Sequence, residues 1–546
     1  MSAITTPPLL ARALVIDESN LSRSVMASLL REMGFTVTQA SRPHDAMRAL
    51  TSGMPYEVIL CEYHFAPRGQ HVMTGQEWLD ELRQSRLIPL TTAVIMVTGE
   101  ARYQCVADSV ENALDDYLLK PFTPGDLQNR MAQVRRRKKA LEAVYSACEK
   151  EDYELAARLA EDIFHLNGPH RLAAARMGAE LFLRLGNHDA AQRLLQAVVQ
   201  AKAVPWARLG LAQVELATNN SRKANRALES LISDEPGYSD AYDLLGRAQI
   251  EELQFGKALA TYANAVELTP GNVSRLQKLG NLQQLMGEPE NAFKHLEAAM
   301  ALGSNSPTLD FQSLFQYCLA GFDLGKPRVW DRPARMLGDA LRKFPQSYRL
   351  QRLREMVGVL EHLEQRSYPK AISTLKGLLT DVLEPQFDFE MGCNVIQLLT
   401  RIERSDVRLT DAADTIKVVG ERFSVSRPAV ELLVLSARLV PEFEEVIRSA
   451  FERMNQLSRR AMWHSLQGDG MKTVQELLAA TQLSRNAKFL SLARASLQKN
   501  RTNLSEQTHS NLASEIERLQ ALYCGYGTHA TSGMRVKPAL KASASA

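Results

Sequence analysis

The feature that most restricts how this chain can fold is a 34-residue period in its middle part. Alanine recurs at that interval in five successive units, at Ala156, Ala190, Ala224, Ala258 and Ala292. Two further sets keep the interval, one four residues later and one upstream: Ala160, Leu194, Leu228, Tyr262 and Leu296, and Gly178, Ala212, Gly246 and Gly280. Small residues let the two helices of a hairpin approach closely, and a larger residue one turn later fills the gap between neighbouring hairpins. The period therefore predicts a solenoid of helical hairpins with one continuous core.

One unit, residues 241–270, carries the repeat most completely, as AYDLLGRAQIEELQFGKALATYANAVELTP. It resembles a tetratricopeptide repeat through Tyr242, Leu245, Gly246, Ala258, Tyr262, Ala265 and Pro270, and Pro236 ends the preceding unit. The resemblance implies a concave groove that binds an extended segment of a partner protein through polar side chains. Arg247, Gln249 and Lys278 are candidate groove residues, and ordinary solvent exposure is the alternative for each. The sequence does not identify the partner.

The period loosens after residue 308, although helical pairing continues. Ala371 and Leu375 repeat the four-residue spacing of the regular units. We expect divergent repeats over 309–400, because the terminal units of a solenoid must present a polar outer face. A C-terminal helical region without identifiable chemistry follows over 401–523. Residues 524–546 are small and basic, and we expect them to be a disordered tail.

Before the repeats, residues 11–134 follow a different pattern, after a short extension at 1–10. Short apolar runs alternate with amphipathic segments, and the runs lie at 13–17, 35–40, 57–62, 92–99 and 116–122. Such an alternation predicts a parallel sheet covered by helices on both faces. Thr123, Pro124 and Asp126 mark the start of the last helix, as cap, first helical residue and first-turn acid. This part of the chain is therefore expected to be an α/β doubly wound domain.

Charged and polar residues close the predicted strands. Parallel strands end at the same edge of a sheet, so these residues should meet in space: Asp17, Glu18, Glu62, Thr98 and Lys120. Carboxylates hold a hard divalent cation, a hydroxyl can donate to a phosphoryl oxygen, and an ammonium offsets anionic charge. The set is suited to phosphoryl chemistry.

Together these motifs resemble the receiver domain of two-component response regulators, which has a flavodoxin-like fold. The resemblance implies that Asp17, Glu18 and the backbone carbonyl of His64 bind Mg²⁺, and that Thr98, Tyr117 and Lys120 form the switch. It also implies a sensor kinase as phosphodonor and the possibility of a homodimer. The two histidines near the site, His64 and His71, lack metal-ligand spacing, so no side-chain metal site is expected there.

The sequence departs from the receiver pattern at the phosphoacceptor position, where Glu62 replaces aspartate. The additional methylene moves the carboxylate by roughly 1.5 Å, which in-line phosphoryl transfer tolerates poorly. The loop from this acid to Gly75 is also longer than usual. We expect a fixed, phosphorylation-independent state, in which Glu62 either imitates a phosphoryl group or simply pairs with Lys120. A site that a kinase still modifies is one alternative, and a phosphatase-like activity of the acid pocket is another.

Composition narrows the classes of partner. The formal net charge is only +3 over 546 residues, six cysteines are scattered without a CxxC pair, and no apolar run is long enough to span a bilayer. The basic run at 135–139, within a helical linker at 135–142, is interpreted as a solvated helix end rather than a DNA contact. Regular repeats are expected over 143–308. The sequence thus indicates a non-catalytic, cytoplasmic signalling adaptor of bacterial two-component type, with protein partners rather than DNA or membrane.

Overall fold

The computed structural model describes residues 11–51, 55–63, 65, 75–84, 87–99, 115–303, 308–405, 409–501 and 504–523. The predicted extension at 1–10 and tail at 524–546 lie outside these residues. The chain forms two compact units, one of residues 1–249, 260–271 and 303–308, and the other of residues 250–259, 272–302 and 309–546. Each is described by itself.

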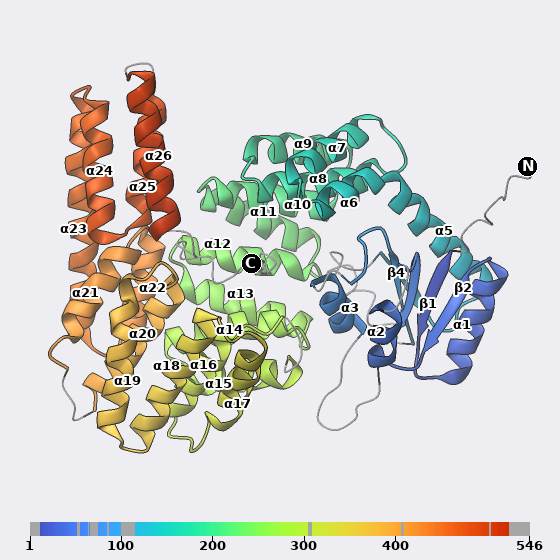
Figure 1. Cartoon of the computed structure of the whole chain (residues 1–546), viewed down its shortest axis with the longest axis horizontal. Coiled ribbons are helices and arrows are strands. Elements are labelled where there is room, and N and C mark those ends of the chain that lie inside the picture. Colours follow the sequence, from blue (N-terminus) through green and yellow to red (C-terminus); the bar gives the residue numbers. More distant parts are fainter. Residues whose placement is uncertain are drawn as a thin grey trace, which may run out of the picture. The chain divides into compact units, whose positions relative to one another are not determined.

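A five-stranded parallel sheet forms the N-terminal domain (Figure 1), in the order β2-β1-β3-β4-β5. The strands are β1 (Arg12–Ile16), β2 (Thr36–Ala40), β3 (Val58–Glu62), β4 (Ala93–Thr98) and β5 (Asp116–Leu119). The central strands β3 and β4 are buried almost throughout, because helices cover both faces and only apolar runs suit such positions. The prediction of a doubly wound α/β domain is confirmed.

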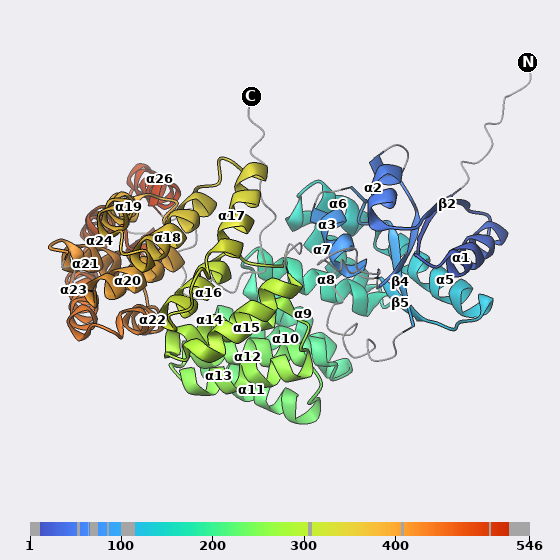
Figure 2. The same ribbon diagram turned by 90° about the horizontal axis from the view of Figure 1, so that it is seen from below.

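Helices cover both faces of this sheet (Figure 2), and two apolar clusters hold them there. On one face, α1 (Asn20–Glu32) and α5 (Pro124–Ala140) contribute Met26, Leu30, Leu127 and Met131. On the other, α2 (Pro43–Thr51) and α3 (Gly75–Gln84) contribute Ala46, Trp78, Leu79 and Leu82. Alternate residues of β1, β3 and β4 point into one cluster or the other, as the two-residue period of a strand requires.

Helix α5 begins as predicted. Thr123 caps it, with the amide of Asp126 donating to Thr123 Oγ1 at 3.2 Å and the amide of Thr123 donating to Asp126 Oδ2 at 2.9 Å. Pro124 is the first helical residue. The helix continues to Ala140, so the boundary predicted at residue 134 falls inside it, and the predicted linker at 135–142 is mostly its last turns.

Helices make up the rest of the described chain (Figure 1). In the region of regular repeats they are α6 (Glu142–Glu149), α7 (Tyr153–His165), α8 (Arg171–Arg184), α9 (His188–Ala201), α10 (Pro205–Ala217), α11 (Ser221–Asp234), α12 (Ser239–Glu251), α13 (Phe255–Leu268), α14 (Val273–Met286) and α15 (Pro289–Leu302). All five alanines of the 34-residue period are buried. The glycines approach the larger periodic residue of their own hairpin: a Cβ on Gly178 would lie 3.0 Å from Leu194, and one on Gly280 would lie 2.6 Å from Leu296. The larger residue thus fills the space inside the hairpin, whereas we predicted that it fills the gap between hairpins.

The remaining helices belong to the second unit. They are α16 (Gln312–Asp323), α17 (Asp331–Lys343), α18 (Tyr348–Glu364), α19 (Tyr368–Thr380), the short 3-10 helix η2 (Asp381–Leu383), α20 (Phe389–Glu403), α21 (Ala412–Phe423), α22 (Arg427–Ala437), α23 (Pro441–Leu466), α24 (Gly470–Ser484), α25 (Ala487–Lys499) and α26 (Glu506–Tyr523). The predicted boundary at 400/401 falls inside α20. Helices α23 to α26 share a core that includes Met454, Leu477, Phe489 and Leu519. Among the described residues, no helix combines the length and the apolar character that crossing a bilayer requires.

Candidate functional site

The carboxyl edge of the sheet gathers charged residues that lie far apart in the sequence. Asp17 directly follows β1, Glu62 ends β3, and Lys120 directly follows β5. The Lys120 ammonium donates to Asp17 Oδ2 at 2.6 Å and also to Glu62 Oε2. The structure therefore joins three of the predicted site residues in one ion-paired cluster.

Asp17 is fixed by the start of α1 as well as by Lys120. It is almost fully buried, at 2% exposure. Its Oδ1 accepts the amide of Ser19 at 2.8 Å, and its Oδ2 accepts the Ser22 hydroxyl at 2.7 Å. Ser19 is also the N-cap of α1, so the turn that starts the helix orients the carboxylate. Both carboxylate oxygens thus already accept hydrogen bonds within the protein.

Glu62 has both of its carboxylate oxygens bound in the same way. Oε1 accepts the amide of Tyr63 at 2.8 Å, and Oε2 accepts Lys120. The side chain keeps 13% of its surface exposed. Both carboxylate oxygens of the residue at the predicted phosphoacceptor position thus accept hydrogen bonds, one of them from the lysine that follows β5.

The ion pairs keep Lys120 charged. Burial alone would lower the pKa of this ammonium, but hydrogen bonds and charge from Asp17 and Glu62 outweigh burial, and the pKa is raised above its ordinary value. Cys61, beside the cluster, is uncharged, because a raised pKa keeps a thiol protonated. Burial raises the pKa of its thiol, and the charges of Glu62 and Asp17 raise it further, so Cys61 stays neutral and unsuited to nucleophilic attack.

The other predicted site residues lie at or near this edge. Glu18 is half-buried, and its Oε1 lies 3.6 Å from Arg42 Nε. Thr98 ends β4 and is buried, and its carbonyl accepts the amide of Lys120 at 2.7 Å. Tyr117 lies in β5 and packs against the cluster formed with α2 and α3. The predicted carbonyl ligand at His64, like His71, lies outside the described residues.

The acids in this arrangement hold a lysine rather than presenting open oxygens to a divalent cation. Asp17 and Glu62 share the Lys120 ammonium, and Glu18 pairs with Arg42. Across the residues that the structure describes, no three His, Cys, Asp or Glu side chains gather as metal ligands would. Because the predicted carbonyl ligand at His64 lies outside the described residues, the Mg²⁺ site stays a prediction.

Gly75 returns the chain to the site after the long loop. Its amide donates to the carbonyl of Tyr63 at 2.7 Å, and α3 begins at this residue. A Cβ on Gly75 would lie 2.3 Å from the backbone oxygen of Glu62. Since no side chain fits at that distance, glycine is required for α3 to start against the end of β3.

A second charged cluster, which the sequence reasoning missed, lies at the opposite edge of the sheet. Lys138 of α5 is 6% exposed, and its ammonium lies 2.8 Å from Asp115 Oδ1 and donates to the Leu90 carbonyl at 2.6 Å. Asp115 immediately precedes β5, and it is also approached by Arg137 at 3.6 Å and Arg83 at 4.0 Å. Burial lowers the pKa of Lys138 to about 8, although Asp115 opposes the change.

This second cluster reaches the first helix of the repeat region. Glu149 of α6 accepts the amide of Leu90 at 2.6 Å, and the Tyr145 ring lies 4.7 Å from the Lys138 ammonium. Burial raises the pKa of Tyr145 to about 12, and the nearby Asp115 raises it further. The cluster therefore joins the sheet to α6.

The prediction that the basic run is a solvated helix end is wrong for Lys138, which is buried, whereas Arg135, Arg136 and Lys139 are exposed and Arg137 is half-buried. Arg137 and Lys138 pair with Asp115, and Arg135 pairs with Glu57 at 2.6 Å. The acids precede β5 and β3, at the edge of the sheet beside the end of α5. Acids just before two strands of the sheet were a signal for these pairs, because a helix that crosses the sheet brings its last turn to that edge.

The candidate groove residues differ in what they can contact. Gln249 is buried, and its Oε1 accepts the Thr261 hydroxyl at 2.8 Å inside its own hairpin, so it supports the scaffold and the groove prediction is wrong for it. Arg247 and Lys278 are half-buried. Their role in partner binding stays a prediction.

In the second unit, the inner helices are packed against one another. Helix α16 is buried at every position from Gln312 to Gly321, and α20 at every position from Met391 to Ile402. Buried amides connect them, with Gln312 Nε2 donating to Asn394 Oδ1 at 2.7 Å. Helix α22 contacts both α20 and α14. Since this unit's own helices surround α16 and α20, they leave no open face for a peptide there.

Comparison with known proteins supports the interpretation of the N-terminal domain. Residues 13–132 match the family model described as the response regulator receiver domain. The two-component response regulator ORR11 of Oryza sativa subsp. indica is 28% identical over 121 residues, which cover 22% of this chain and 78% of that protein.

Solved structures similar to parts of the chain fall into two groups. The chemotaxis response regulator CheY4 of Vibrio cholerae is 23% identical, with a TM-score of 0.21, and the match covers 23% of this chain and 99% of that one. A tetratricopeptide repeat protein from Parabacteroides merdae is 15% identical, with a TM-score of 0.35, and the match covers 48% of this chain and 97% of that one. On the family match, the sheet and the helical period together, this chain carries a response regulator receiver domain at residues 13–132, followed by helical repeats of tetratricopeptide type.

Proposed function

We propose that this chain is a non-catalytic signalling adaptor, in which a receiver domain of fixed state is coupled to a helical scaffold that binds a protein partner. The observation that carries the proposal is the shared lysine: Lys120 bridges Asp17 and Glu62, the two carboxylates that phosphorylation would require to be rearranged. Glutamate at this position adds one methylene to the acceptor arm, and its charge is already neutralised. The receiver then acts through its shape and surface, without a covalent change.

The opposite edge of the sheet supports the coupling. Glu149 of α6 and Lys138 of α5 both bind the backbone of Leu90, so a displacement of the sheet is passed to the first helices of the repeats. The regular repeats are the proposed partner-binding part, since α16 and α20 are enclosed by helices of their own unit. A protein segment that binds along the helices after α6 would then be linked mechanically to the receiver through α6.

A phosphorylation test separates this function from a conventional regulator. The purified chain and its Glu62→Asp and Glu62→Gln variants are incubated with a small-molecule phosphodonor and Mg²⁺, and intact masses are measured. We expect no gain for the natural chain and a gain of one phosphoryl group for Glu62→Asp, because the shorter acid restores the usual acceptor geometry.

The second candidate is a regulator that is still phosphorylated. The family match over residues 13–132 favours it, together with the retained Asp17, Thr98 and Lys120. A phosphoryl group that appears on the natural chain and disappears in Glu62→Gln would replace the fixed-state proposal by this one. Release of phosphate from a phosphorylated receiver added in trans would instead support a phosphatase-like activity.

A further inference from the structure

Helix α23 leaves one face uncovered along its whole length. One stripe of exposed positions recurs at intervals of four and three residues, which places them on one side of the helix, and we call it the exposed seam: Glu445, Ser449, Glu452, Gln456, Arg459, Trp463 and Leu466. The opposite face packs into the unit through Phe443, Ile447, Ala450 and Met454. The helix thus has one face that packs against its own unit and one face that is exposed to solvent.

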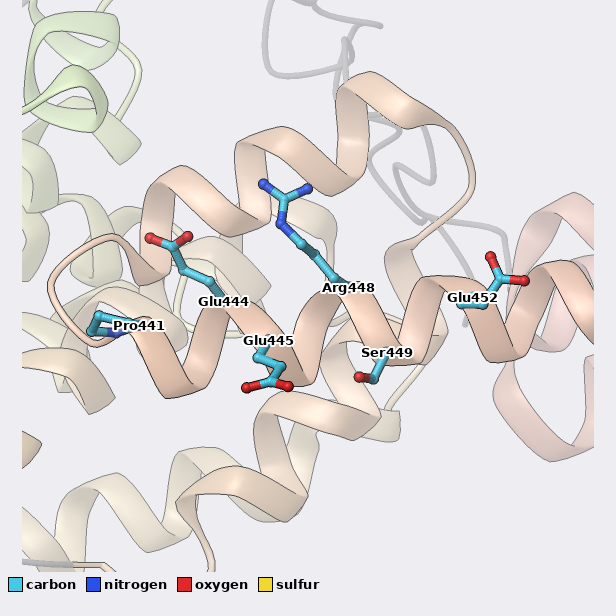
Figure 3. Close-up of a pocket in the computed structure, with 6 residues that line it drawn as sticks. All are labelled: Pro441, Glu444, Glu445, Arg448, Ser449 and Glu452. Carbon is cyan, nitrogen blue, oxygen red and sulfur yellow. The ribbon is translucent and has the colours of Figure 1, made fainter.

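The two halves of this exposed seam differ in chemistry. The first half borders a surface hollow, shown in Figure 3, that is lined by Pro441, Glu444, Glu445, Arg448, Ser449 and Glu452. In that view Glu444 and Arg448 project from one side of α23, and Glu445 and Ser449 from the other. Arg448 is bound by Glu431 of α22 at 2.8 Å, and Glu452 lies 3.6 Å from Arg459 of the same helix, so the hollow presents mainly the carboxylates of Glu444 and Glu445.

The second half is apolar and basic. Trp463 is 57% exposed and Leu466 is 84% exposed, beside Arg459 and Arg460, whose side chains are 74% and 71% exposed. Acidic residues near the N-terminus of α23 and arginines near its C-terminus also interact favourably with the dipole of this helix. The dipole gives no reason, however, for an exposed tryptophan and leucine on the same seam, and such residues are typical of interfaces.

We propose that two copies of this chain associate through α23, with the helices antiparallel. A two-fold axis near the middle of the helix places the basic, apolar half of each copy over the acidic hollow of the other. Such an interface is self-complementary, because the same pairing of charges occurs twice. Trp463 and Leu466 lose their solvent exposure. Arg459 and Arg460, which each lie 3.6 Å from a carboxylate of their own chain, at Glu452 and Glu476, gain a second carboxylate from the other copy.

Charge exchange tests the pairing in the full-length chain. Arg459→Glu/Arg460→Glu makes the seam acidic throughout, and Glu445→Arg/Glu452→Arg makes it basic throughout. Sedimentation over a range of concentrations should show a dimer for the natural chain and monomers for each variant, because like charges then face each other. An equimolar mixture of the two variants should sediment as a dimer again.

Two controls keep the test decisive. Lys223→Glu/Arg226→Glu on α11 makes the same change of charge on another exposed surface and should leave the dimer intact. Trp463→Gln/Leu466→Gln, which alters no charge, should raise the dimer dissociation constant at least about tenfold. A natural chain that stays monomeric overturns the proposal, as does a dimer that survives both charge reversals or a mixture that stays monomeric. None of these results depends on the phosphorylation state of Glu62.

Discussion

Each of the two edges of the receiver sheet holds a lysine beside at least one carboxylate, and the pKa values of the two lysines are shifted in opposite directions. At the carboxyl edge, Lys120 has two acids, and its pKa is raised. At the opposite edge, the more deeply buried Lys138 has one acid and two neighbouring guanidinium groups, and its pKa is lowered to about 8. The first edge is a charged site that solvent reaches, and the second is a buried joint to α6. In the proposed function, the first edge is the surface that the receiver presents and the second edge links the sheet to the repeats.

The largest expected effect concerns the buried joint. Because the pKa of Lys138 is about 8 when folded and near 10.5 when unfolded, the unfolded chain binds more protons between these values. Stability should therefore rise with pH from about 8 to about 10.5, by up to about 3 kcal/mol. Urea unfolding at a series of pH values should show this rise for the natural chain and its loss for Lys138→Met. The neighbouring exposed Lys139→Met is the matched control and should keep it. An unchanged rise in Lys138→Met would show that this lysine does not titrate in that range.

The next largest effect on stability is expected at the carboxyl edge of the sheet, at Gly75. Gly75→Ala puts a Cβ 2.3 Å from the carbonyl oxygen of Glu62, so β3 and α3 must separate. We expect a loss of about 2 kcal/mol in unfolding free energy. Gly125→Ala is the matched control, since the nearest atom to its Cβ is 3.7 Å away. Equal stabilities of the two variants would mean that the loop yields freely at Gly75.

These contacts also show which parts of the structure could be predicted from the sequence. The strand-end residues Asp17, Glu62 and Lys120 were predictable, because a parallel sheet brings the ends of its strands to one edge whatever the loops do. Lys138 was not, since its burial depends on where α5 crosses the sheet and on α6 packing over it. Periodicity in the repeats likewise predicted buried alanines, but it could not predict that α16 and α20 would be enclosed, because that depends on how the less regular helices after α15 pack around them.

A smaller effect is expected at Lys120 itself. Lys120→Met leaves Asp17 and Glu62 facing one another without a cation, and the unfolding free energy at pH 7 should fall by about 1 to 2 kcal/mol, less than for a fully buried pair. Adding Glu62→Gln to this variant removes one of the two like charges and should recover part of the loss. A Lys120→Met chain as stable as the natural one would show that the cluster is not a stabilising bridge.

The smallest effect is expected for the exposed ion pair between Arg135 and Glu57, at the same edge of the sheet as Lys138. Arg135 and Glu57 lie 2.6 Å apart, but their side chains are 46% and 42% exposed, so water screens the pair. Glu57→Gln should lower the unfolding free energy by less than about 0.5 kcal/mol, and the difference should vanish in high salt. Arg135 also lies over the Phe35 ring at 5.3 Å, a contact that the substitution leaves in place. Asp115→Asn, which removes the buried acid of the same edge, is the comparison: its loss should be several times larger and should persist in salt. Equal losses for the two variants would show that burial does not set the strength of these pairs, and that the joint depends on the basic run as a whole.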